Sequence, residues 1–287
     1  MWHSETLPVL APPTARRVVT LHDLRWLERR SITGASLLGH CARGVFSRLL
    51  MPSHLKGLDA VIAVSSFTRR ELEDRLGVAA RCIPNAVVPA GSPRPDPATV
   101  AEILQRLGVR SPFVLYVGQL TARKGIDLLL DVIELGRRRE ALAPLTLVVA
   151  GEGGEYGRLL KKARRAGILE KVRFVGSVGD DVRDALLVSC EALLFPSRFE
   201  GFGFPVFEAL AAGRPVVASA LPSLEPFATE AILRAEGSAA AFAVALESVI
   251  HRGEELRREA LASIDRHRQQ DWNQSARELA DLYVALL

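Results

Sequence analysis

The sequence predicts an α/β protein with two doubly wound parallel sheets. From residue 113 to residue 219, short apolar runs alternate with helical patterns, and the links between them are short. This order is typical of a parallel sheet that is covered by helices on both faces. A stretch with four prolines in nine residues, 89–97, precedes this region and is expected to be a linker. The chain is therefore expected to form two domains.

Composition favours a globular protein and excludes several other classes. The 287 residues are 48% hydrophobic and 24% charged, as in globular proteins of one or two domains. No apolar run approaches the roughly 20 residues of a membrane span, and the first residues lack the pattern of a signal peptide. The three cysteines, Cys41, Cys82 and Cys190, have no CxxC spacing. This predicts a cytoplasmic protein without a disulfide framework or a zinc site.

The net charge differs between the N-terminal region and the rest of the chain. Residues 1–90 contain 12 Lys and Arg against 7 Asp and Glu, whereas the rest of the chain contains 25 against 26. A basic segment suits peripheral contact with an anionic membrane surface or an acidic acceptor, although solvated arginines are the simpler explanation. Nucleic acid is not an expected partner, because the basic residues are not interleaved with stacking aromatic residues.

The N-terminal region is expected to contain three strands. Runs rich in β-branched or apolar residues predict them at 18–21, 59–64 and 81–84. Ser65 and Ser66 follow the second run and are N-cap candidates for a helix over 67–76. His22 and Asp23 follow the first run, so they are expected at the carboxyl end of a buried strand.

The C-terminal region supplies the alternating pattern. Apolar runs predict strands at 113–117, 145–150, 172–175, 193–195 and 216–218. Helical patterns cover 98–107, 126–139, 181–189, 206–212, 239–250, 254–269 and 272–287. Gly118 turns the chain after the first of these strands.

A basic turn lies between the strand 113–117 and the helix 126–139. It contains Arg123, Lys124 and Gly125. Two cations beside a helix N-terminus suit a diphosphate, because each charge-assisted hydrogen bond is worth roughly 1.5–3 kcal/mol. The alternative is an exposed basic loop.

Two common phosphate-binding motifs are absent. The glycine-rich segment 151–154 is followed by Tyr156, where a dinucleotide fingerprint requires glycine, and no G-x-x-x-x-G-K-[ST] occurs. NAD and P-loop nucleotide binding are therefore not expected.

The segment 193–219, LLFPSRFEGFGFPVFEALAAGRPVVAS, combines a strand, a glycine loop and a helix. Such a corner at the carboxyl edge of a sheet binds anions. Glu200 and Glu208 flank it. A glycoside-hydrolase pair would have to face each other about 5–9.5 Å apart, which a loop-to-helix path does not ensure; hydrolysis is disfavoured but stays open. The alternative is that each carboxylate binds hydroxyl groups at a different end of one ligand.

Residues 200–219 resemble the E-x7-E segment of GT-B retaining glycosyltransferases, family 4. The resemblance implies that Glu200 contacts the transferred sugar and Glu208 the ribose of the nucleotide. Residues 117–125, VGQLTARKG, resemble the phosphate-binding turn of the family, although Gln119 stands where many members have arginine. Phosphate binding would then depend on Arg123 and Lys124. The implied catalytic residues are Glu200, Arg123, Lys124 and His22, and the implied donor-binding residues are Gly118, Gln119, Gly201, Phe202, Gly203 and Glu208.

The resemblance implies transfer of a sugar, with retention, from a nucleotide-sugar donor to a glycan or lipid-linked acceptor, as in polysaccharide biosynthesis. The adjacent Arg-Lys pair is similar to that of mannosyltransferases that use GDP-mannose. No cofactor or metal is expected, because the chain has no Asp-x-Asp pair and the cations could hold the charge of the departing diphosphate. The alternative is a non-catalytic relative that binds a nucleotide sugar or serves as a partner subunit.

The family pattern divides the chain into an acceptor-side domain (1–90), a linker and helix (91–111), a donor-side domain (112–270) and a final helix (271–287) that crosses back. Trp2-His3-Ser4 is similar to the end of a central strand in relatives, whose opening strands have no counterpart here. The first domain is therefore expected to be incomplete, with the strand 18–21 near an uncovered sheet edge. A homodimer would cover that edge.

Overall fold

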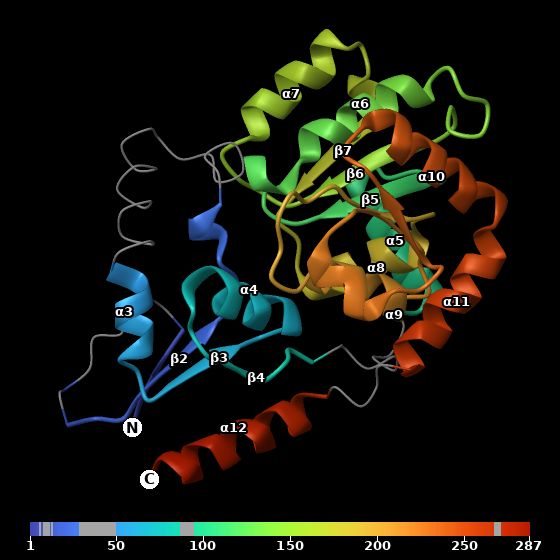
Figure 1. Cartoon of the computed structure of the whole chain (residues 1–287). Helices are drawn as coiled ribbons and strands as arrows, with labels where there is room; N and C mark the ends of the chain where they lie inside the picture. Colours follow the sequence, from blue (N-terminus) through green and yellow to red (C-terminus); the bar gives the residue numbers. More distant parts are fainter. Residues whose placement is uncertain (6, 8–11, 13, 29–49, 87–94, 267–270) are drawn as a thin grey trace.

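The structure is a computed structural model that describes residues 1–5, 7, 12, 14–28, 50–86, 95–266 and 271–287. Two separate parallel sheets organise these residues (Figure 1). Most of the expected linker lies outside the described residues, and helix α5 (Pro97–Leu107) begins at its last proline.

The N-terminal sheet has the strand order β1-β2-β3-β4, and every pair is parallel. Its strands are β1 (Trp2–Ser4), β2 (Arg17–Leu21), β3 (Ala60–Ala63) and β4 (Arg81–Cys82). The three strands expected from apolar runs are confirmed, but the expected number was wrong: the described residues add β1. Because β1 pairs with β2 through His3 and Val18, β2 lies one strand inside the edge. The run Trp-His-Ser was too short and too polar to be recognised by its pattern alone.

Helices cover both faces of the N-terminal sheet. Helices α3 (Met51–Lys56) and α4 (Ser66–Leu76) pack on the face that presents Val19 and Val61. Ser65 caps α4 by accepting a hydrogen bond from the Thr68 amide, as expected. The opposite face packs against α12 (Trp272–Leu286), which lies across the sheet from α3 and α4 in Figure 1.

The C-terminal sheet has the order β10-β9-β8-β5-β6-β7, again entirely parallel. Its strands are β5 (Phe113–Val117), β6 (Thr146–Ala150), β7 (Val172–Gly176), β8 (Leu193–Phe195), β9 (Val216–Ser219) and β10 (Ile232–Ala235). The five expected strands are confirmed, and β10 was missed. The chain builds outwards from β5 in one direction to β7, then returns to the other side of β5 with β8. This doubly wound order places the reversal between β5 and β8.

The helices of this region form two layers. One layer is α6 (Ile126–Gly136), α7 (Tyr156–Arg165) and α10 (Ala239–His251); the other is α5, α8 (Asp180–Ser189), α9 (Phe204–Ala211) and α11 (Gly253–Arg266). The expected helix 126–139 was too long, because α6 ends at Gly136, where Leu142 packs against the glycine. Helix α7 was missed. Asp180 and Asp181 lie in the first turn of α8, whose N-cap is Gly179.

Candidate functional site

The candidate site lies at the carboxyl ends of β5 and β8, where the order of strand addition in the C-terminal sheet reverses. Strands β5 and β8 are neighbours, and the loops at their carboxyl ends carry most of the expected site residues. Gly118 and Gln119 follow β5, and residues 200–203 follow β8. In open α/β sheets, ligands bind in the crevice outside this topological switch point. The fold therefore brings together two segments that are about eighty residues apart in the sequence.

Glycine allows the two loops to touch. Gly125 ends the short 3-10 turn Ala122–Lys124 with a φ of 65° and begins helix α6. A methyl group at this position would overlap the carbonyl oxygen of Pro196, in the loop after β8. The Arg198 amide donates a hydrogen bond of 2.9 Å to the Arg123 carbonyl. The basic turn is thus fixed against the loop that carries the first glutamate.

Arg123, Lys124 and Glu200 form a three-charge cluster. The Lys124 Nζ donates to Glu200 Oε1 at 2.6 Å, and the Arg123 Nη1 lies 3.0 Å from Glu200 Oε2. The Arg123 Nη1 also donates to the Phe199 carbonyl at 2.7 Å. The side chains of Arg123, Lys124 and Glu200 are only 12%, 14% and 10% exposed. Because two cations share one carboxylate, the cluster keeps one net positive charge in a largely desolvated place.

A hydrogen bond from Tyr116, within β5, holds the turn that follows this strand. Gln119 is exposed, while its carbonyl accepts a hydrogen bond of 2.9 Å from the Tyr116 hydroxyl. Tyr116 is almost fully buried, and this burial raises the pKa of its hydroxyl. Tyr116 therefore acts as a neutral donor that fixes the main chain beside Gly118.

The Phe202 side chain belongs to the core. It is 4% exposed, and its ring lies 4.8 Å from the ring of Phe207 and 5.8 Å from that of Phe227. If residue 202 contacts a bound ligand, only its main chain can make that contact. Gly203 follows with a φ of 101° and is the N-cap of α9, which begins with Phe204.

The glycine loop also contacts the N-terminal sheet. The Ser65 Oγ donates to the Gly201 carbonyl at 2.8 Å, and a methyl group at Gly201 would overlap the carbonyl oxygen of His22. The ring centroids of Phe67 and Phe199 lie 6.0 Å apart. Since Ser65 and His22 follow strands of the N-terminal sheet, the carboxyl ends of the two sheets meet at Gly201.

His22 meets this junction through its main chain, while its side chain faces elsewhere. The imidazole is half-exposed, with Nε2 3.9 Å from the Glu5 carboxylate. It lines a cavity of about 300 Å³ between the N-terminal sheet and the start of α12, together with His3, Asn85 and Trp272. The structure thus places the His22 main chain beside the loop of Glu200, whereas the His22 side chain lines the cavity next to α12.

Glu208 lies on α9, behind the glycine loop. Its side chain is 20% exposed, and its Oε1 lies 3.6 Å from the Nη1 of Arg183 on α8. Arg183 was not selected from the sequence, because its pairing with Glu208 joins two helices between which the chain forms strand β8. The residue spacing along α8 could indicate only neighbours of Arg183 on the same helix.

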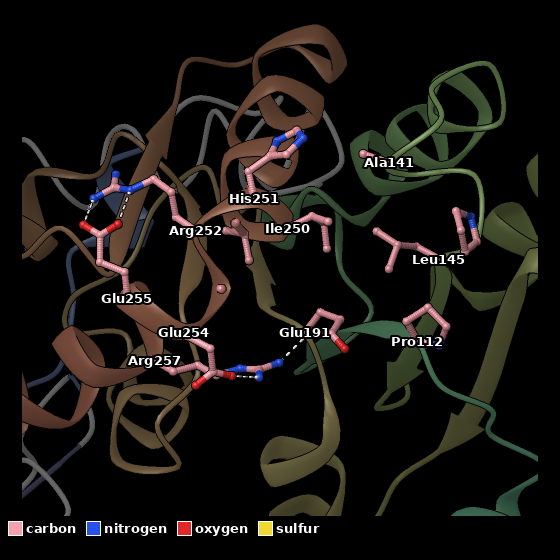
Figure 2. Close-up of a pocket in the computed structure, with 13 residues that line it drawn as sticks. Pro112, Ala141, Leu145, Glu191, Ile250, His251, Arg252, Glu254, Glu255 and Arg257 are labelled. Atoms are coloured by element: carbon pink, nitrogen blue, oxygen red, sulfur yellow. Dashed lines mark hydrogen bonds and ion pairs between the residues drawn. The ribbon is translucent and has the colours of Figure 1, made fainter.

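A second cavity, of about 630 Å³, lies at the opposite edge of the sheet (Figure 2). Pro112, Leu145 and Glu191, just before β5, β6 and β8, line it. Its two arginines are already paired: Arg252 lies 2.6 Å from Glu255, and Arg257 lies 2.7 Å from Glu191. Both arginines of this cavity are therefore compensated by carboxylates of the described residues.

The described residues contain neither a metal-binding cluster nor a membrane-spanning helix. Among them, no group of three or more His, Cys, Asp and Glu side chains is arranged to hold a metal ion. No helix in the described part of the chain has the length and apolar character needed to cross a membrane.

Comparison with known structures defines the class of protein. The fold is that of the GT-B glycosyltransferases. A sucrose-phosphate synthase from Thermosynechococcus elongatus superposes with a TM-score of 0.76 at 22% identity, over 94% of this chain and 68% of the other. Anabaena HepE in complex with UDP-glucose gives a TM-score of 0.76 at 20% identity, over 94% and 72%.

Sequence comparison places the chain in a family. Residues 102–266, more than half of the chain, match the family described as "Glycosyl transferases group 1". The chain belongs to this family.

Curated relatives include a glycogen synthase and a phosphatidyl-myo-inositol mannosyltransferase. The former, from Mycobacterium tuberculosis, is 34% identical over 60% of this chain and 42% of its own length. The latter, from Mycobacterium leprae, is 32% identical over 83% of this chain and 62% of its own length. A GDP-mannose-dependent alpha-(1-6)-phosphatidylinositol monomannoside mannosyltransferase from M. tuberculosis is 36% identical over 56% and 44%. The chain thus spans less than two thirds of these relatives.

Proposed function

We propose that the protein is a retaining, metal-independent glycosyltransferase that moves a sugar from a nucleotide-sugar donor to a glycan or lipid-linked acceptor. The observation that carries this proposal is the convergence of Arg123, Lys124 and Glu200 at the switch point of the C-terminal sheet. Family membership supports the reaction class. Retention is carried over from the resemblance of residues 200–219.

The cluster is suited to hold a departing diphosphate. Within the described part of the chain, the contacts of Arg123 use only Nη1, so the N–H groups of Nε and Nη2 are available. Lys124 uses one of its N–H groups on Glu200. Glu200 keeps both cations side by side and pre-organised, and an oxygen that gains charge in the transition state would receive the remaining donors.

The two glutamates would then have separate roles. Glu200 lies beside the cations and would contact the transferred sugar, whereas Glu208 lies further back on α9 and would accept hydrogen bonds from ribose hydroxyls. The main chain at 201–203 and at Gly118 and Gln119 would line the donor between them. Phe202 would contribute its main chain only, because its ring is buried.

GDP-mannose is the donor that we propose. The adjacent cations Arg123 and Lys124 and the names of two mannosyltransferase relatives support it. The same names, which refer to phosphatidylinositol species, support a lipid-linked acceptor. The HepE complex contains UDP-glucose, so a uridine donor is the competitor to test.

The acceptor side is proposed to be residues 1–90, with 91–111 as the connection, 112–270 as the donor side and 271–287 as the helix that crosses back. Packing of Leu282 on Val18 and Ile62 supports the last assignment. His22 is proposed to act next to the acceptor. Peripheral membrane contact through the basic first segment and a homodimer that covers the N-terminal sheet stay predictions.

The test begins with a thermal-shift panel of UDP-, GDP-, ADP- and dTDP-sugars. We expect GDP-mannose, as the proposed donor, to raise the melting temperature most. A ligand at 100 times its Kd stabilises the folded protein by about 2.7 kcal/mol. Release of nucleoside diphosphate is then measured with a mannosylated phosphatidylinositol acceptor. Donor binding without turnover would instead indicate a non-catalytic relative, and no stabilisation by any donor would contradict the proposal.

A further inference from the structure

Arg183 is surrounded by three carboxylates from two helices. On α8, its Nη1 donates to Asp180 Oδ1 at 2.7 Å and its Nη2 to Asp184 Oδ1 at 2.9 Å. The same Nη1 lies 3.6 Å from the Oε1 of Glu208 on α9. Arg183 and Glu208 are 26% and 20% exposed, whereas Asp180 is 85% exposed. The guanidinium therefore connects a solvated helix terminus to a carboxylate on the edge of the donor site.

We propose that Arg183 is a positioning residue for donor binding, which holds the Glu208 carboxylate in place and in its charged form to receive the donor's ribose. This inference rests on the proposed function, because it concerns the same donor site. Arg183 itself need not touch the donor, since the proposed contact with the ribose is made by the Glu208 carboxylate.

The charged form of Glu208 matters because an ionised carboxylate is an acceptor only, and two adjacent ribose hydroxyls are both donors. A protonated carboxyl group would present its own hydrogen to one of them. Holding the charge is costly at this position. Burial raises the pKa of Glu208, the attraction of Arg183 lowers it, and repulsion from Asp184 and Asp180 raises it again.

Among the described residues, no element other than α8 supplies a positive group that lowers the Glu208 pKa. Helix α9 also packs against β8, β9 and α11. Within the described part of the chain, none of the charged residues of those elements is among the groups that shift the Glu208 pKa. Arg183 is the one positive group that acts on Glu208 there, so removing it leaves burial and two like charges unopposed.

The sign of the pH effect follows directly. When the Glu208 pKa rises, the ionised fraction is lost at a higher pH as the solution is acidified. Arg183→Met should therefore move the loss of donor affinity to higher pH. For each unit by which the Glu208 pKa rises, the affinity at a pH below the transition should fall by about tenfold. Asp180→Asn should move it to lower pH, because it removes a like charge and a competing acceptor on the same Nη1. Opposite shifts from two neighbouring residues are not expected from a general loss of structure.

The experiment is calorimetric titration of GDP-mannose and UDP-glucose between about pH 5 and about pH 8. The proteins are the wild type, Arg183→Met, Arg183→Lys, Asp180→Asn, Glu208→Gln and the double variant Arg183→Met/Glu208→Gln. We expect a threefold to tenfold weaker affinity for Arg183→Met at the acidic end, near-normal affinity at the basic end, and partial rescue by Arg183→Lys. In Glu208→Gln, which cannot titrate here, the effect of Arg183→Met should disappear.

Two results would overturn the inference. One is an equal loss of affinity at every pH for Arg183→Met; the other is the same loss in the Glu208→Gln background. If Arg183→Met does not fold, Asp180→Asn decides the question, because an unchanged or upward shift would contradict the proposal. A wild type that binds neither donor would instead count against the proposed function.

Discussion

Removing the ammonium group of Lys124 separates the proposed catalytic role of the three-charge cluster from its structural role. Lys124→Ala deletes the 2.6 Å hydrogen bond to Glu200 but leaves Arg123 in place, 3.0 Å from the other carboxylate oxygen. The buried carboxylate thus keeps one cationic partner. Loss of stability should be moderate, while loss of transition-state stabilisation should be large.

The two effects have different magnitudes. A charge-assisted hydrogen bond contributes about 1.5–3 kcal/mol, whereas a buried charge left without any partner costs about 3–5 kcal/mol. Because Glu200 is only 10% exposed but retains Arg123, the lower range applies. It corresponds to a fall in melting temperature of about 3–10 °C. Loss of a donor to the developing charge of the diphosphate should lower kcat by about 10²–10³.

The assay measures nucleoside diphosphate release and the melting temperature of the same preparations, with Lys161→Ala as the matched control. Lys161 is exposed on α7 and has no ion pair among the described residues, so neither quantity should change. If Lys124→Ala lowers the melting temperature but keeps kcat within threefold of the wild type, Lys124 is a structural residue only. The proposed role of the cluster would then be refuted.

Three further predictions concern the same site. Glu208→Gln should weaken binding of the free nucleoside diphosphate, whereas Glu200→Gln should lower turnover with little change in nucleotide affinity; equal affinities by calorimetry in the wild type and both variants would remove these roles. Turnover should persist in EDTA, and activity that vanishes there and returns with manganese would show that a metal holds the charge. Gly201→Ala should destabilise by about 1–3 kcal/mol, since its methyl group meets a main-chain oxygen of the other sheet. Gly157→Ala, which meets nothing within 4 Å, should not destabilise, and equal losses of melting temperature in the two glycine variants would contradict the contact.

Local patterns were sufficient for the elements that position the site. The apolar runs before Gly118 and Pro196 predicted β5 and β8, because a strand that is buried on both faces has a continuous run of apolar residues in the sequence. The helix expected at 206–212 corresponds to α9, which has Pro205 in its first turn, where the missing N–H is tolerated, and is followed by Gly213 with a φ of 71°. The glutamates could be located from one segment, since the loop and helix that carry them are contiguous.

Contacts between distant segments could not be predicted in this way. The Ser65–Gly201 hydrogen bond and the Arg183–Glu208 pair each join residues on different elements, and no local period reports such a contact. The resemblance implied donor binding at Phe202, but it could not show that the Phe202 ring packs into an aromatic cluster with Phe207 and Phe227, so that only the main chain is left for such a contact. Short elements such as β10, with an exposed arginine, leave too few apolar positions to be recognised.

The charges at the site are arranged as a nucleotide sugar would require. Around Glu200, two cations share one carboxylate, which leaves one positive charge; around Arg183, one cation shares three carboxylates, which leaves two negative charges. A diphosphate is an anion, and ribose presents hydroxyl donors, so each of these two parts of the donor would meet the sign that attracts it. A diphosphate placed beside the acidic N-terminus of α8 would instead be repelled by its carboxylates. The opposite signs of the two clusters therefore support the proposed assignment, with the diphosphate at Arg123 and Lys124 and the ribose at Glu208.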